Sequence, residues 1–155
     1  MFKSFLKNKT DSNQKDDSDN LDDKVFSLAC VLIEAAMADE SFGEDEKRVI
    51  NRILMKHFKI SKGERLKNII DKAIKNFDES SDLITHTKII KENWPLDDRI
   101  EVIEMLWKVC LIDGVLEPYE DMLIRRVSGL IYVNDKNRKI AKNRALDQLE
   151  NDEKG

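Results

Sequence analysis

The sequence contains few residues that interrupt helices, with only 2 prolines and 5 glycines in 155 positions. Long helices are therefore favoured over a sheet with many turns. No stretch alternates between apolar and polar residues for long enough to predict a strand. Hydrophobic residues make up 41% of the 155 positions, which is enough for one buried core. We predict a single all-helical domain.

Three further absences argue against other classes of protein. No apolar run approaches the roughly 20 residues that a membrane span needs, and the lysine-interrupted start is too short for a secretory signal peptide. The net charge of −4 argues against a general nucleic-acid binder, which needs cations to neutralise phosphates. Cys30 and Cys110 both fall in apolar runs, so we expect buried free thiols and a cytoplasmic, reducing location.

The two ends of the chain differ from the rest in composition. Residues 1–9 place Phe2, Phe5 and Leu6 among lysines, which is typical of a short amphipathic segment. Such a segment is either a frayed terminus or a weak peripheral contact with the inner face of an anionic membrane. The following residues up to 20 contain no apolar side chain and predict a disordered acidic linker. We expect the folded domain over residues 21–150 and a disordered tail over 151–155.

Apolar residues recur at helical spacing throughout the expected domain and predict about seven helices. Asn134 is placed to cap the last helix, Asp78 or Ser80 the fourth, and Ser61 the third. Pro118 suits the first position of the sixth helix, where its missing amide hydrogen has no cost. The expected ranges are about 21–39, 44–58, 61–77, 80–94, 97–112, 118–131 and 134–149, with Ile84, Trp94 and Trp107 among the inward-facing residues.

One short segment occurs twice in the chain. The stretch "MADESFGEDE", residues 37–46, is echoed 74 positions later by "LIDGVLEPYE", residues 111–120. Each copy places an aspartate after an apolar run and a glutamate seven residues further on, which predicts a duplicated helix–loop–helix unit. The identical pairs are Asp39 and Asp113, Glu46 and Glu120, Ile50 and Ile124, and Arg52 and Arg126.

The repeated acids have two interpretations. Glu46 and Glu120 fall near the third residue of a helix, where a carboxylate stabilises unpaired amides and the positive end of the helix dipole. They can therefore act as caps alone. Asp39 and Asp113 instead follow the carboxyl ends of helices, where a negative charge is unfavourable unless a cation is bound. Carboxylates and carbonyls are the ligands of hard cations, so these four acids are a candidate divalent-cation site, with calcium as first choice.

Other metal and catalytic motifs are not present in the sequence. The loops lack the ligand spacing of an EF-hand, and Phe42 and Leu116 in their middles are expected to anchor them to the core. Asp82 and His86, four residues apart, form a surface hydrogen bond more often than a metal site, and His57 suits the end of a helix dipole. No nucleophile elbow or glycine-rich phosphate loop occurs, so we expect no enzyme activity.

Two segments carry a resemblance to a known family. "LACVLIEAAMADESFGEDEKRVINRIL", from residue 28, and "DDRIEVIEMLWKVCLIDGVLEPYEDMLIRRVSGL", from residue 97, resemble the two halves of the TerB-like family. That family includes tellurite-resistance TerB proteins and the N-terminal domain of the DjlA co-chaperone. The resemblance covers about residues 21–149. It implies an all-helical domain whose acidic loop residues are associated with divalent-cation binding, here Asp39, Glu46, Asp113 and Glu120.

The resemblance also implies a role in a stress response of the tellurite-resistance type, exerted through protein partners. The alternative is a metal-independent interaction module related to the DjlA N-terminal domain, in which the acids serve only as helix caps. The family often has Asp-Gly in both loops, whereas Glu40 follows Asp39 here, so we expect a weaker first site. The chain has no His-Pro-Asp triplet, so it is not a complete co-chaperone of the DjlA kind.

Overall fold

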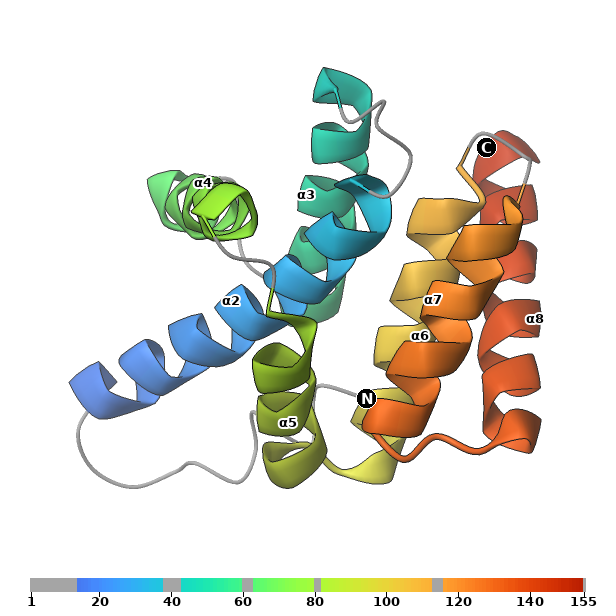
Figure 1. Cartoon of the computed structure of the whole chain (residues 1–155). Coiled ribbons are helices and arrows are strands. Elements are labelled where there is room, and N and C mark those ends of the chain that lie inside the picture. The colour runs from blue at the N-terminus through green and yellow to red at the C-terminus, as the bar shows by residue number, and fades with distance from the viewer. Residues whose placement is uncertain (1–13, 38–42, 60–62, 80–81, 113–115, 155) are drawn as a thin grey trace.

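The computed structural model describes residues 14–37, 43–59, 63–79, 82–112 and 116–154. Within these ranges the chain forms seven helices and no strand, so the all-helical prediction is confirmed (Figure 1). The helices are α2 (Gln14–Met37), α3 (Glu44–Phe58), α4 (Glu64–Glu79), α5 (Leu83–Asn93), α6 (Leu96–Cys110), α7 (Pro118–Leu130) and α8 (Asp135–Lys154).

Two helices organise the packing of all the others. Helix α2 packs against α3, α4 and α5, whereas α6 packs against α7 and α8, as Figure 1 shows. The two groups meet where α6 contacts α2 and α3. The molecule therefore consists of two helical units, one centred on α2 and one centred on α6, with a shared core.

The sequence repeat corresponds to a repeat in burial. Leu32 and Leu106 are both fully buried, and so are Ile50 and Ile124. Arg52 and its counterpart 74 positions later are both exposed. Because corresponding positions face the same environment, α2 with α3 and α6 with α7 are structurally equivalent helix–loop–helix units. Cys30 and Cys110 are buried free thiols, as expected.

Two helices extend into segments that their polar composition predicts to be disordered. Helix α2 begins at Gln14, so the part of the expected disordered linker from residue 14 to residue 20 is helical. Helix α8 continues to Lys154, so most of the expected disordered tail is helical as well. Adding a residue to an existing helix costs little compared with nucleating one, and a long helix can therefore extend into polar sequence. The expected amphipathic segment of residues 1–9 lies outside the described residues.

The start of α5 also differs from the prediction. The helix is capped by Asp82, whose carboxylate accepts hydrogen bonds from the backbone N–H and the hydroxyl of Thr85 at 3.1 and 2.6 Å. With this start, Leu83, Thr87 and Ile90 form the buried stripe. Ile84, predicted to face inward, lies beside that stripe and is 58% exposed. Asp78 is not the cap, and Ser80, like Ser61, lies outside the described residues.

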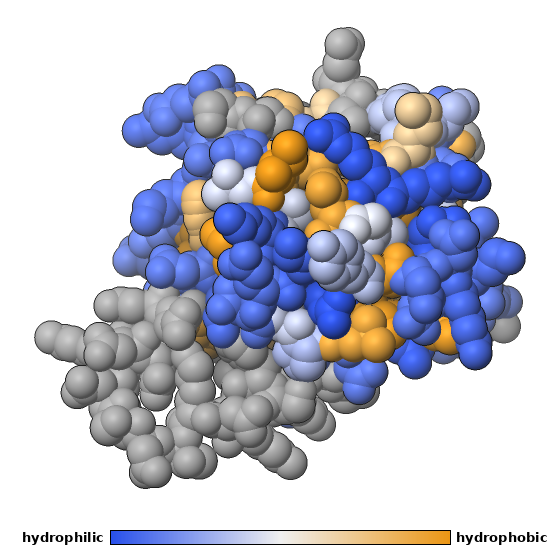
Figure 2. All heavy atoms as spheres, turned by 60° about the horizontal axis from the view of Figure 1, so that its bottom comes forward, coloured by the Kyte–Doolittle hydropathy of each residue, from blue (hydrophilic) through white to orange (hydrophobic). Residues whose placement is uncertain are grey.

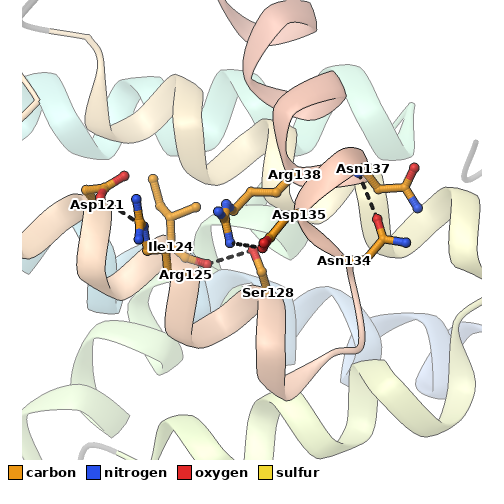
Figure 3. Close-up of polar contacts among 8 residues, drawn as sticks. All are labelled: Asp121, Ile124, Arg125, Ser128, Asn134, Asp135, Asn137 and Arg138. Atoms are coloured by element: carbon orange, nitrogen blue, oxygen red, sulfur yellow. Dashed lines mark hydrogen bonds and ion pairs between the residues drawn. The ribbon is translucent and has the colours of Figure 1, made fainter.

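The turn from α7 to α8 is fixed by local hydrogen bonds (Figure 3). The Asn134 side chain accepts the backbone N–H of Asn137 at 2.9 Å, which confirms the predicted cap. The Ser128 hydroxyl donates to the carbonyl of Ile124 at 2.7 Å, so this buried polar group has a partner inside its own helix. Pro118 occupies the first turn of α7, as predicted.

None of the helices in the described ranges combines the length and the apolar character that crossing a bilayer requires. Figure 2 shows one face of the molecule, on which hydrophobic residues form small patches separated by hydrophilic side chains. The exposed large hydrophobic residues, such as Met122 and Tyr132, also belong to different elements of the chain.

Helix α6 is buried on all sides. Every residue from Ile100 to Cys110 is buried, including Trp107, which is 3% exposed. The ring of Trp107 lies 5.0 Å below the ammonium group of Lys142 on α8. This tryptophan therefore belongs to the core, as its position on an apolar helical face predicts.

Replacing Trp107 with alanine should lower the free energy of unfolding by roughly 3–5 kcal/mol, because the surrounding helices cannot close the cavity. Urea unfolding followed by circular dichroism measures the change. Met122→Ala, at a position 69% exposed, is the control and should change the stability by less than about 0.5 kcal/mol. A Trp107→Ala variant of unchanged stability would contradict the assignment of this residue to the core.

Candidate cation site at the repeated loops

The candidate site is at the end of the molecule where both helix–loop–helix turns lie. In Figure 1 the carboxyl ends of α2 and α6 and the amino ends of α3 and α7 are in the upper half, and α8 ends there too. Glu46 is in the first turn of α3 and Glu120 in the first turn of α7. Asp39 and Asp113, the other two predicted ligands, lie outside the described residues.

The two glutamates make the same hydrogen bond in the two units. The carboxylate of Glu46 accepts the backbone N–H of Gly43 at 2.8 Å. The carboxylate of Glu120 accepts the backbone N–H of Glu117 at 3.0 Å. In both cases the donor is the residue that precedes the helix, and a carboxylate there also meets the positive end of the helix dipole. The capping role predicted for both glutamates is therefore present in both units.

The environments of the two carboxylates differ. Glu46 is half-buried, whereas Glu120 is only 6% exposed. In the second loop, Leu116 packs against the core, as expected for an anchor; Phe42, its expected equivalent in the first loop, lies outside the described residues. The glutamate of the second unit is thus held more firmly than that of the first. A buried carboxylate must be neutralised or well hydrogen-bonded, because burial removes it from water.

The oxygen chemistry of the loops fits a hard cation. The loops and the helix starts after them carry carboxylate and carbonyl oxygens, which are the ligand atoms that hard cations prefer. Within the described residues, no three His, Cys, Asp or Glu side chains lie close enough together to hold a metal ion. A cation at this end would therefore depend on the loop residues 38–42 and 113–115 together with Glu46 and Glu120.

Asp82 and His86 each contact other residues of the described chain. The carboxylate of Asp82 caps α5, and hydrogen bonds from Thr85 hold the pKa of this carboxyl below its usual value. The Nε2 atom of His86 lies 3.3 Å from the side-chain oxygen of Asn76, and its ring meets Phe26 edge-on at 5.7 Å. Burial lowers the pKa of His86. The contacts of His86 hold α5 against α2 and α4.

A buried polar pair that the sequence analysis missed joins the two units. The Nδ1 atom of His57 on α3 lies 3.3 Å from a carboxylate oxygen of Glu101 on α6, and the side chains are 11% and 10% exposed. About one turn further along the same side of α6, Glu104 accepts a hydrogen bond from Gln148 of α8 at 3.1 Å. Burial raises the pKa of Glu101, but the hydrogen bond from His57 and the attraction of the imidazole outweigh it, so the pKa lies below its ordinary value.

A signal for this pair was present in the sequence. Asp98, Glu101, Glu104 and Lys108 recur at intervals of three or four residues between the apolar residues of α6, and all four are buried. The sequence analysis did not consider these residues as buried groups, because charged residues usually lie on the surface. A helix whose apolar residues leave no clear polar face is instead buried on all sides, and its charged residues then need partners on other helices.

The fold and the repeated turns define a class of protein: an all-helical module of two units, each with an acidic residue capping the helix after its loop. The family model "Tellurite resistance protein TerB" matches residues 26–143, so the chain belongs to the TerB family. The match runs from within α2 to within α8 and contains both loops. No curated protein and no solved structure matches the chain.

Replacing Glu101 with glutamine should destabilise the protein by about 1–3 kcal/mol at pH 7, because the buried partner of His57 loses its charge. The pKa of Glu101 is lower in the folded protein than in the unfolded chain. Its contribution is therefore present above the unfolded pKa, about 4.3, and is lost as the pH falls through the folded value. The stability difference between wild type and variant should narrow from pH 6 to pH 3.

Urea unfolding at a series of pH values measures this difference. Glu92→Gln, which removes an exposed carboxylate from α5, is the control and should have little effect at any pH. A Glu101→Gln variant whose deficit stays the same down to pH 3 would show that the ionised carboxylate does not stabilise the fold.

Proposed function

We propose that this TerB-family protein is a non-enzymatic cytoplasmic module that binds a divalent cation through its two acidic loops. It acts through protein partners in a stress response of the tellurite-resistance type. Residues 1–9, outside the described ranges, add a weak peripheral contact with the membrane. Family membership supports the stress-response context, and the two matched glutamates support the cation site.

The observation that carries the cation proposal is the equivalence of the two capping bonds. Glu46 and Glu120 each accept a hydrogen bond from the backbone N–H of the residue three positions earlier. Both carboxylates are therefore held in place after a segment that also contains an aspartate. Fixed carboxylates lose little further side-chain entropy when they bind an ion. Because the ligands on offer are oxygens, calcium is the first choice.

The second candidate function is a metal-independent interaction module. The two capping hydrogen bonds support this function too, because they already give each glutamate a structural role as a helix cap. Substitution with glutamine separates the two functions. The amide oxygen of glutamine can accept the capping hydrogen bond, but a neutral side chain is a much poorer ligand for calcium than a carboxylate.

Calcium should raise the melting temperature of the wild-type protein, and titration calorimetry should detect binding. At a hundredfold excess of calcium over Kd, the expected stabilisation is about 2.7 kcal/mol. The variant Asp113→Asn with Glu120→Gln should lose more of this effect than Asp39→Asn with Glu46→Gln. The reason is that the second loop contains Gly114 after its aspartate and holds its glutamate in a buried position.

The matched control removes two exposed carboxylates far from the loops in sequence, through Glu92→Gln with Asp147→Asn. It should respond to calcium as the wild type does. Equal melting temperatures of the wild type in chelator and in millimolar calcium, magnesium or zinc would overturn the cation proposal. The capping function would then be the remaining role of the glutamates.

A further inference from the structure

A small groove lies between α3, the end of α6 and the end of α8. Its volume is about 60 Å³, and its apolar lining comes from Val49 and Ile53 of α3, Ile112 after α6, and Leu149 of α8. Ile53 is 7% exposed and forms part of the floor, whereas Ile112 is 46% exposed. The groove therefore offers a recessed apolar surface large enough for one aliphatic side chain.

The remaining lining residues are all cations: Arg52, Lys56 and Lys108. No carboxylate is among the described residues that line the groove, although the whole chain has a net charge of −4. Arg52 and Lys56 are exposed and four residues apart on α3, about 6 Å along the helix axis. Neither forms an ion pair with an acid in the described part of the chain.

A second cavity on the other face of α3 gives a contrast. It has a volume of about 280 Å³ and is also lined by cations, among them Lys47, Arg48 and Lys67. There, however, Lys47 pairs with Asp71 at 3.1 Å and Arg48 pairs with Asp45 at 3.5 Å. Most of its positive charge is thus balanced inside the molecule. The groove beside α8 instead combines an apolar floor with two exposed cations, Arg52 and Lys56, for which the described part of the chain shows no ion pair.

We propose that this groove binds an acidic amphipathic helix of a partner protein. Two carboxylates one turn apart on such a helix match the spacing of Arg52 and Lys56. One aliphatic side chain between them enters the apolar space, which is the usual way in which a helix anchors in a groove. The proposal rests on the part of the proposed function that gives the protein a partner, and it does not depend on cation binding.

The shape of the groove favours a helix over an anionic membrane. Ile53 and Lys108 are each only 7% exposed, so the deepest part of the binding surface is recessed below the exposed ends of Arg52 and Lys56. A flat bilayer surface would contact the exposed cations and leave the recessed apolar residues uncovered. A projecting side chain can reach them.

The test is a selection of random peptides displayed on phage, carried out with the full chain in the presence of chelator. Two baits are used in parallel: the wild type and a double variant that combines Arg52→Glu with Lys56→Glu. Peptides enriched only on the wild type should carry acidic residues three or four positions apart around an aliphatic residue. Their affinity, measured by fluorescence anisotropy, should be at least about tenfold weaker for the charge-reversed variant, which corresponds to about 1.4 kcal/mol.

Two further variants control for stability and for general charge effects. Arg52→Gln with Lys56→Gln removes the charges without reversing them and should weaken binding by a smaller factor. Lys67→Glu, which changes an exposed cation of the other cavity, should bind within about twofold of the wild type. The melting temperature of each variant shows whether it is folded.

The proposal would be overturned if no acidic helical peptide is enriched on the wild type. Equal peptide binding by the wild type, the double glutamate variant and the double glutamine variant of Arg52 and Lys56 would overturn it as well. Vesicles containing phosphatidylserine are tested in the same buffer. Binding to these vesicles that depends on Arg52 and Lys56, without peptide binding, would identify a membrane contact and would also overturn it. All these measurements are made in the presence of chelator. A negative result therefore concerns the groove alone, whereas the calcium titration tests the cation site.

Discussion

The constraint on which the structure depends is the burial of a helix that carries charged residues. Helix α6 has no face in water from Ile100 to Cys110, yet it contains Glu101, Glu104 and Lys108. A buried charge without a partner would cost more than a typical core contact contributes. The fold meets this constraint with side chains from two of the helices around α6, His57 on α3 and Gln148 on α8. The position of α6 therefore fixes α3 and α8 as well.

The duplicated units respond to this constraint in different ways. In the first unit, α2 is buried by α4 and α5, while in the second, α6 is buried by α7, α8 and the first unit. The two glutamates are thus equivalent in their capping hydrogen bond but not in their surroundings, since Glu120 is more buried than Glu46. The groove that we assign to a partner helix lies along this boundary, between α3 of one unit and α6 and α8 of the other.

The sequence predicted the local features of the fold well and the contacts between distant segments poorly. The helices, the cap at Asn134, Pro118 in the first turn of α7 and the core position of Trp107 all follow from patterns within one or two helical turns. The spacing of the charged residues in α6 indicates a buried carboxylate at Glu101, but it cannot name the partner, because His57 lies 44 positions away. The helical start of α2 was missed because composition alone does not show how far a stable helix extends.

The arrangement around α6 also has a consequence for synthesis of the chain. A protein is made from its amino end, so α2 to α5 leave the ribosome before α6 does. Until then, the surfaces of α2 and α3 that pack on α6 remain in water, and His57 lacks the acceptor that it meets in the finished molecule. The first unit is thus an incomplete intermediate of translation, and the complete core forms only when the second copy of the repeat has been made.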